Sequence, residues 1–330
     1  MPVLNAGATL RSSVQSVLNQ DYEEIIEIIL SIGPSRDTTS AVSVELESTD
    51  KRVKIIENPS GRTASALNAA ASIATGDYLV RVDAQSKLDK TYIQQAIKTI
   101  QKKKAANVGG IQKAEGASVL ERSIASAMTS KFGVGNSRFH YGGDEGPVDT
   151  VYLGVYDAPI FHKLGGFDES LKRNQDYELN IRLRKAGYTV WFDPNLIVRY
   201  RPRSTFQALF KQYFQYGQWK RSVIKLHPSS IRLRQLVPPL LILGIFGGIL
   251  VSILESIWGL LIPFMYMTAV LLSTFISKEC NGWSRCFLFF VFPTMHIAWG
   301  LGFLFGPLEW ISRSKATDKE PLAIRPYEKT

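Results

Sequence analysis

Two long stretches without charge, in the last third of the chain, restrict its architecture more than any other feature. Residues 236–277 contain one charged residue, Glu255, and residues 287–308 contain none. The apolar core of a bilayer is roughly 30 Å thick, so the first stretch is long enough to cross it twice and the second once. The residues before 236 have the mixed composition of an α/β domain. We therefore expect a soluble domain followed by a membrane domain with about three apolar segments.

The formal net charge of +10 is unevenly placed. Basic residues gather just before the first apolar stretch, at Arg199, Arg201, Arg203, Lys211, Lys220, Arg221, Lys225, Arg232 and Arg234. Basic residues beside a membrane span are retained on the cytoplasmic side and attracted by anionic headgroups. We therefore expect membrane lipid rather than nucleic acid as the partner of this charge. The soluble domain is expected in the cytoplasm, at the plasma membrane.

Apolar strands alternate with helices over the first 112 residues. Strands are expected at residues 25–32, 53–57, 77–82 and 107–112, and the first of them is a β-branched run typical of a buried parallel strand. Helices are expected at residues 62–75 and 89–103, the first of them ended by Gly76. This alternation predicts an α/β fold with an open, mostly parallel sheet and helices on both faces.

Polar side chains follow three of the expected strands. Gly33–Asp37 follow the first, Asn58 and Gly61 the second, and Asp83 the third. Ligands of open α/β sheets bind at the carboxyl ends of the strands. We therefore expect these turns to meet at one rim and to form a nucleotide site.

The beginning of the chain has an unusual form. Pro2-Val3-Leu4-Asn5 has the character of a strand end, yet no full strand precedes the first helix, which the spacing of Leu10, Val14, Val17 and Leu18 predicts. Either the sheet lacks its first strand or the sequence is shortened, and we favour the second explanation.

Two further regions complete the soluble part. Residues 114–147 are rich in glycine and are expected to be an irregular loop that shapes a binding site. A strand at 148–156 and a helix at 175–185, stopped by Gly187, follow this loop.

Asp83 lies at the end of a strand, in Arg81-Val82-Asp83-Ala84-Gln85. A carboxylate beside a nucleotide site can bind a divalent cation, which takes oxygen ligands and neutralises diphosphate charge. A turn or capping aspartate is the alternative. Because two other turns lead to the same rim, we favour the metal site.

Asp176 and Glu178 stand at the start of the helix expected at 175–185. Acidic residues in a first helical turn often stabilise the helix and nothing more. An acidic residue close to the bound donor can also act as the general base for an acceptor hydroxyl. The sequence leaves both alternatives open.

Aromatic and amide side chains are mixed in residues 211–220. Such a helix suits sugar binding, because rings pack on apolar sugar faces and amides bind hydroxyls. It equally suits an amphipathic helix at a membrane surface.

Taken in order, these pieces resemble the glycosyltransferases of family 2, and most closely the membrane-attached branch typified by succinoglycan-type glucosyltransferases. The resemblance rests on Pro2-Val3-Leu4-Asn5, residues 16–22, Gly33-Pro34-Ser35-Arg36-Asp37, residues 58–68, residues 76–83, Asn174-Gln175-Asp176-Tyr177-Glu178, and Gln215-x-x-Gln218-Trp219. It implies the GT-A fold, a mixed and mostly parallel sheet with helices on both faces, followed by transmembrane helices.

The resemblance also implies an inverting transfer of a hexose from a nucleotide-diphosphate sugar to a hydroxyl of a lipid-linked saccharide or a polysaccharide. Mg²⁺ or Mn²⁺ would be held by Asp83, and Asp176 would be the catalytic base. Donor-binding residues would be Pro2, Asn5, Asp37, Asn58, Gly61, Arg62, Asn68, Arg81 and Asp83. Acceptor-binding residues would be Asp149, Glu178, Gln215, Gln218 and Trp219.

The chain departs from the family pattern at the metal motif. The usual motif is Asp-x-Asp, whereas Gln85 stands in its second position. An inactive membrane scaffold that binds sugar nucleotides is therefore one alternative to the transferase. A processive polysaccharide synthase is another, because Gln215-x-x-Gln218-Trp219 is similar to the Gln-x-x-Arg-Trp motif of processive members, with Gln218 in place of the arginine.

The expected organisation has four parts. They are a catalytic domain at 1–203, amphipathic basic juxtamembrane helices at 204–234, a membrane domain at 235–308 and a polar tail at 309–330. With the catalytic domain inside, three spans place the tail outside, whereas its basic residues favour the inside. One apolar segment that re-enters or lies in the interface is the alternative.

Overall fold

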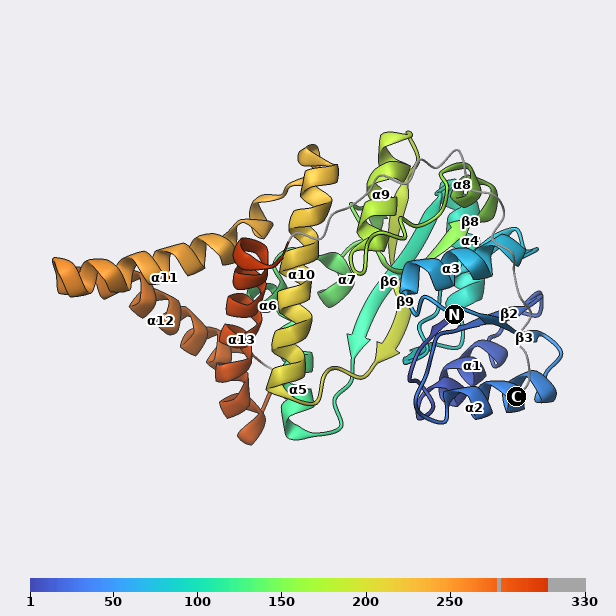
Figure 1. The fold of residues 1–330 in the computed structure, drawn as a ribbon, viewed down its shortest axis with the longest axis horizontal. Coiled ribbons are helices and arrows are strands. Elements are labelled where there is room, and N and C mark those ends of the chain that lie inside the picture. The colour runs from blue at the N-terminus through green and yellow to red at the C-terminus, as the bar shows by residue number, and fades with distance from the viewer. Residues whose placement is uncertain (278–279, 308–330) are drawn as a thin grey trace. The chain divides into compact units, whose positions relative to one another are not determined.

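The computed structural model describes residues 1–277 and 280–307. Two compact units are present among the described residues: unit 1 comprises Met1–Gln112 and Gly142–Tyr200, and unit 2 comprises Lys113–Tyr141 together with residues 201–277 and 280–307. Unit 1 contains the sheets and unit 2 the long apolar helices (Figure 1). The boundary after Tyr200 lies close to the expected one at 203, although residues 113–141 belong to unit 2. The expected tail, 309–330, lies outside the described residues.

A parallel sheet of three strands opens unit 1. Its strands are β1 (Pro2–Val3), β2 (Ile28–Ile32) and β3 (Val53–Glu57), in that order. The residues of β2 are buried throughout, as expected of an apolar strand covered on both faces. Pro2 pairs with Ser31, so the expectation that no strand precedes the first helix is corrected to a strand of two residues.

The helices of this half of unit 1 follow the apolar spacing of the sequence. They are α1 (Leu10–Leu18), α2 (Thr39–Thr49), α3 (Thr63–Ile73) and α4 (Tyr92–Lys103). Leu10, Val14 and Val17 lie on one face of α1 and are buried in the core of unit 1. Helix α3 ends at Ile73 and its C-cap residue, Ala74, is extended, so the prediction that Gly76 caps the helix is wrong.

The second sheet has six strands and a different character. Its order is β4 (Tyr78–Val80), β8 (Tyr152–Asp157), β6 (Asn107–Ala114), β9 (Val190–Tyr200) and β5 (Ser86–Leu88), and β7 (Gly146–Pro147) pairs with β9. The pairs β4–β8, β5–β9, β6–β8 and β7–β9 are antiparallel. The parallel pairs β1–β2 and β2–β3 and these antiparallel pairs together confirm a mixed arrangement of strands. These antiparallel pairs join strands that lie far apart in the sequence, so local spacing could not predict them.

A cavity of about 690 Å³ in unit 1 is lined by residues of β2, α3 and β4. Ile28, Ala70 and Leu79 contribute to its apolar lining, and Arg81 and Tyr156 also lie on its wall. It therefore reaches the residues that follow β4.

Two helices complete unit 1. Helix α8 spans Ala158–Lys163, and α9 spans Gln175–Lys185, as the sequence predicts. Asn174 precedes α9 in the left-handed conformation with φ 63°, and Gly187 follows it with φ 86°. Asparagine and glycine tolerate this conformation best, which explains both helix ends.

The prediction of an irregular loop at 114–147 is wrong over much of this range. Residues 119–141 form α5 (Val119–Thr129), α6 (Lys131–Val134) and α7 (Arg138–Tyr141). Ser118 and Glu121 make a capping box at the start of α5, and this spacing was the overlooked helix signal. Ile124 and Met128 of α5 are buried, and the helix packs on α13 within unit 2.

Unit 2 is otherwise helical. It contains α10 (Phe206–Leu226), α11 (Val237–Leu254), α12 (Leu261–Ile276) and α13 (Trp283–Phe305), with single 3₁₀ turns at Pro228–Ser230, Leu233–Gln235 and Ile257–Leu260. Among the described residues, three helical segments are long and apolar enough to cross a membrane: Val237–Leu254, Ile257–Ile276 and Trp283–Phe305. The prediction of three apolar segments is confirmed.

Helix α10 packs closely on α13. A Cβ atom on Gly217 would lie 2.0 Å from the carbonyl oxygen of Trp299, and one on Gly302 would lie 2.0 Å from that of Phe214. Only glycine permits such an approach of two helix backbones. One face of the helix expected at the membrane surface is therefore occupied by a membrane-span candidate.

Candidate active site

The candidate site lies in unit 1, where the chain leaves β4. The backbone N–H of Arg81 donates to the carbonyl of Gly154 on β8, which continues the sheet by one residue. The Arg81 side chain is 8% exposed, and its Nε and Nη2 donate to Oδ1 of Asp83 at 3.1 and 3.0 Å. The side chain of Asp83 keeps 21% of its surface exposed. The buried guanidinium of Arg81 therefore holds the carboxylate of Asp83, which solvent still reaches.

Asp176 joins this pair from the first turn of α9. Nη1 of Arg81 donates to Oδ1 of Asp176, whose side chain is 28% exposed. Asp83, the predicted metal ligand, and Asp176, the predicted base, are thus brought together by one guanidinium. Both remain accessible, so neither is enclosed in a buried ion pair.

Burial and charge act in opposite directions on this group of three residues. Burial raises the pKa of Asp176, the charge of Arg81 lowers it, and Asp83 raises it, with a net rise. Burial lowers the pKa of Arg81, but Asp176 and Asp83 outweigh this and raise it. Arg81 is therefore a permanent cation beside a carboxylate that accepts protons more readily than an ordinary aspartate.

The expected convergence of three turns is confirmed. The N–H of Gly33 donates to Val3 O at 2.7 Å, and a Cβ atom on Gly33 would lie 3.2 Å from the Cα of Gly61. The hydroxyl of Thr9 donates to the carbonyl of Ala84 at 2.8 Å, which joins the segment after β1 to the turn at Asp83. The ends of β1, β2 and β3 and the turn after β4 therefore share one rim.

Asn5 and Asp37 organise this rim. Asn5, with φ 48°, accepts from the N–H of Arg36 at 2.8 Å, and its own N–H donates to Ser35 at 3.0 Å. Asp37 accepts from the N–H of Gly7 at 2.9 Å and from the hydroxyl of Thr39. The Thr39 hydroxyl and then the Gly7 N–H hold the pKa of Asp37 below its usual value. Asn5 and Asp37, both predicted to bind the donor, thus connect the segment after β1 to the turn after β2.

The turn after β3 contains Asn58 and Gly61. Asn58 is 6% exposed, its Nδ2 donates to Arg62 O at 3.2 Å, and its Oδ1 accepts from Ser60 at 2.7 Å. Gly61 adopts φ 61°, a conformation that side chains disfavour. Asn58 therefore shapes the turn from inside.

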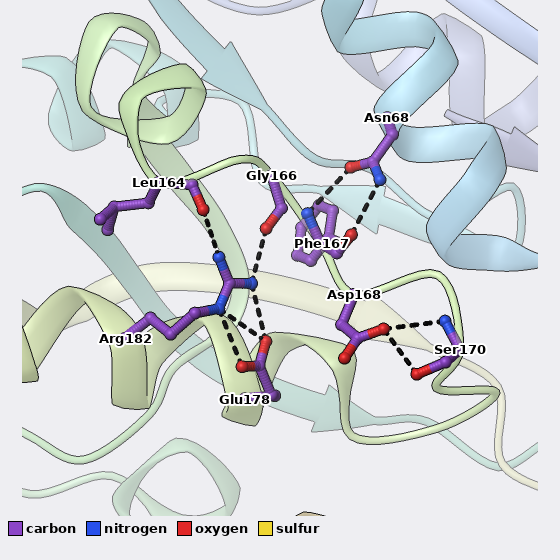
Figure 2. A network of polar contacts seen from close by, with 8 residues as sticks. All are labelled: Asn68, Leu164, Gly166, Phe167, Asp168, Ser170, Glu178 and Arg182. Atoms are coloured by element: carbon purple, nitrogen blue, oxygen red, sulfur yellow. Dashed lines mark hydrogen bonds and ion pairs between the residues drawn. The ribbon is translucent and has the colours of Figure 1, made fainter. Parts of the chain in front are cut away.

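Asn68 and Glu178, by contrast, are engaged within the protein. The Asn68 side chain pairs with the backbone of Phe167, and Glu178 is 4% exposed and forms an ion pair with Arg182 at 2.7 Å (Figure 2). In this conformation Glu178 braces α9 through Arg182, and its role in acceptor binding stays a prediction. The acceptor role predicted for Asp149, which precedes β8, stays a prediction.

Gln215, Gln218 and Trp219 lie on α10 in unit 2. Trp219 is 2% exposed, and Nε2 of Gln218 donates to the carbonyl of Pro307 at 2.7 Å. Arg221 donates to the carbonyl of Leu304 at 2.7 Å, so two side chains of α10 satisfy backbone carbonyls at the end of α13. This motif therefore stabilises a helix end, and its role in acceptor binding stays a prediction.

The residues present suit a cation that arrives with its ligand. Among residues 1–277 and 280–307, no group of three His, Cys, Asp or Glu side chains could hold a metal ion. Asp83 offers one accessible carboxylate, and Gln85 is exposed beside it. Mg²⁺ is commonly held by one or two carboxylates, with phosphate oxygens and water as its other ligands. The donor set therefore fits a cation shared with a diphosphate.

Sequence reasoning overlooked the segment 164–170 and Arg182. Gly165 and Gly166 both have positive φ, 76° and 65°, and form a tight turn that Arg182 holds through carbonyl oxygens. Two adjacent glycines and the i, i+4 spacing of Glu178 and Arg182 were the available signals.

Comparison with known proteins agrees with this geometry. A succinoglycan biosynthesis protein, ExoA, of Rhizobium meliloti (strain 1021) is 28% identical over 310 residues, 92% of each chain. A dolichyl N-acetyl-alpha-D-glucosaminyl phosphate 3-beta-D-2,3-diacetamido-2,3-dideoxy-beta-D-glucuronosyltransferase of Methanococcus voltae is 28% identical over 283 residues, 83% of this chain and 85% of the relative.

The fold has solved counterparts too. The mannosyltransferase PcManGT from Pyrobaculum calidifontis superposes with a TM-score of 0.58 at 15% identity, over 92% of this chain and 85% of that one. This likeness concerns the fold. The model of the family "Glycosyl transferase family 2" matches residues 1–165, half of the chain. The chain therefore belongs to glycosyltransferase family 2, and it is an enzyme of the succinoglycan-type branch with a GT-A fold.

Proposed function

We propose that this glycosyltransferase moves a hexose from a nucleotide-diphosphate sugar to a hydroxyl of a lipid-linked saccharide or a polysaccharide, with inversion at the anomeric carbon. The observation that carries the proposal is the placement of Asp83 and Asp176 on one buried Arg81, at the rim where the strand ends meet. Asp83 lies at the end of the donor turns, and Asp176 reaches the same place from α9. One rim thus offers a site for the diphosphate and a base for the acceptor.

Asp176 is suited to deprotonate the acceptor hydroxyl. Its side chain is accessible, and burial raises its pKa, which makes it a stronger base than an ordinary aspartate. The oxygen freed of its proton attacks the anomeric carbon from the face opposite the diphosphate. A single displacement through an oxocarbenium-like transition state inverts the configuration, as in inverting glycoside hydrolysis.

Arg81 and Asp83 serve the leaving diphosphate. Asp83 would hold Mg²⁺ or Mn²⁺, and such a cation neutralises negative charge on the leaving group. The solved complex of PcManGT contains GDP-Man and Mn²⁺, which supports the proposal. Arg81 holds Asp83 in place through two hydrogen bonds to Oδ1.

The acceptor is proposed from unit 2 and the relatives. The names of the two relatives refer to succinoglycan and to a dolichyl phosphate-linked sugar, that is, to a polysaccharide and a lipid-linked acceptor. Three candidate membrane spans would keep the enzyme at a lipid surface. Basic residues before the first span favour a cytoplasmic catalytic unit at the plasma membrane.

Asp176→Asn tests the proposal in the full chain in membranes, with a panel of UDP-, GDP- and TDP-sugars. We expect the wild type to transfer one of these sugars with inversion, seen by NMR of the product, and Asp176→Asn to lose transfer by about 10²–10⁴-fold. Asp21→Asn is the matched control, because Asp21 forms an exposed ion pair with Lys90. Unaltered transfer by Asp176→Asn excludes the base assignment, and a wild type that binds donor without turnover indicates a scaffold.

A further inference from the structure

Arg182 of α9 holds three groups at once. Its Nε donates to Glu178 at 2.8 Å, its Nη1 donates to Leu164 O at 2.5 Å, and its Nη2 donates to Gly166 O at 2.6 Å (Figure 2). The guanidinium therefore joins one carboxylate of α9 to two carbonyls of the segment 164–170. A planar fork of this kind is specific to arginine, because a lysine ammonium cannot hold such partners in one plane.

The same segment is fastened to α3 on its other side. Asn68 Nδ2 donates to Phe167 O at 2.8 Å, and Phe167 N donates to Asn68 Oδ1 at 2.9 Å (Figure 2). Glu169 accepts from the Ser65 hydroxyl at 2.9 Å and from Asn68 at 3.0 Å. The fit is tight, since a Cβ atom on Gly166 would lie 2.6 Å from Asn68 Oδ1. The segment is therefore held from both sides by directed hydrogen bonds.

These contacts connect the donor turn with α9, the helix that carries Asp176. Helix α3 begins at Thr63, directly after the donor turn at residues 58–62. Helix α9 carries Asp176 in its first turn and Arg182 nearly two turns later. Asp176 and Glu178 are two residues apart and so face different sides of α9. One side contacts Arg81, and the other is held by the segment 164–170.

We propose that Asn68 and Arg182 are positioning residues for the transfer reaction. Together they fix the segment 164–170 between α3 and α9, and so set the place of Asp176 relative to the donor turn. The inference rests on the proposed function, because it assigns Asp176 the role of base. A displacement of a reacting group by about 1 Å can lower a rate by about 100-fold, so a rigid connection of this kind has a catalytic effect.

Arg182→Lys in the full chain is the direct test, with Lys185→Gln, an exposed residue of the same helix, as the control. We expect Arg182→Lys to lower kcat about 10- to 100-fold. The KM for the donor and the Kd for UDP or GDP, measured by calorimetry, should stay within about twofold, because the donor turn keeps its own hydrogen bonds. Asn68→Ala should also lower kcat, and it carries the test of kcat if Arg182→Lys does not fold. The nucleotide Kd is compared only for Arg182→Lys, because the resemblance also places Asn68 among the donor-binding residues.

A double variant separates positioning from a general structural role. If Arg182 acts through Asp176, then Arg182→Lys has no further effect on kcat once Asp176 is replaced by asparagine. Independent effects in the double variant, or an equal loss of kcat and nucleotide affinity, overturn the inference. Unchanged kcat in both Arg182→Lys and Asn68→Ala also overturns it. Failure of the proposed function gives a different result, because Asp176→Asn alone would then keep wild-type transfer.

Discussion

Arg81 is hydrogen-bonded to Asp176, which lies 95 positions further along the chain. The same guanidinium holds Asp83. A buried arginine thus connects the residue proposed to hold the metal with the residue proposed as the base. This contact places the turn after β4 beside the start of α9 and defines the candidate site.

The first prediction concerns pH. Because the pKa of Asp176 is raised, kcat/KM should fall as the pH drops through a value above that of an ordinary aspartate, where the base becomes protonated. Arg81→Met removes a charge that lowers this pKa, so the acidic limb should move to higher pH. Tyr156, on the neighbouring strand, stays neutral because burial raises its pKa.

The pH profile of kcat/KM measures this shift. Arg11→Gln is the control, since Arg11 forms an exposed pair with Glu45. An acidic limb that stays in place, or moves to lower pH, in Arg81→Met contradicts the prediction.

The second prediction concerns the metal. Chelation by EDTA should abolish transfer by the wild type, and Mg²⁺ or Mn²⁺ should restore it. Asp83→Asn replaces the accessible carboxylate by a weaker ligand, so the cation concentration for half-maximal activity should rise at least about tenfold. Titration of each cation against initial rate checks both points. An unchanged requirement in Asp83→Asn would show that another group holds the cation.

The third prediction concerns the donor turn. Gly61→Ala forces a side chain into the left-handed region and should cost about 1–2 kcal/mol of stability. Gly187→Ala imposes the same kind of strain after α9, in open space. Both variants should therefore unfold at lower temperature, but only Gly61→Ala should weaken UDP or GDP binding. Equal nucleotide Kd values for the two variants would remove Gly61 from the donor site.

The fourth prediction concerns the contact between α10 and α13. Gly217→Ala places a methyl group 2.0 Å from the carbonyl oxygen of Trp299, so the helices must separate, at a cost of about 1–3 kcal/mol or more. Gly247→Ala on α11 is the control, because nothing lies within 4 Å of its Cβ position. Thermal unfolding in detergent measures the difference. The prediction is wrong if the two variants have the same midpoint.

The sequence by itself determined the elements whose signals are local. The uncharged stretches predicted the three apolar helices, because hydrocarbon accepts only continuous apolar segments. The bounds of α9 followed from its spacing and from Gly187, and the polar turns after the strands predicted a common rim. Each of these features depends on neighbouring residues or on a general rule of open sheets.

Only the tertiary structure decided what depends on distant partners. Asp176 and Glu178 look equivalent in the sequence, yet Asp176 meets Arg81 and Glu178 is taken up by Arg182. The sequence predicted a loop for the residues of α5, whereas in the structure this helix packs on α13. Gln218 was predicted to bind the acceptor, and in the structure it donates to the carbonyl of Pro307. The physical reason is the same in each case: burial and hydrogen bonding depend on which groups folding brings together, and spacing along one segment does not contain that information.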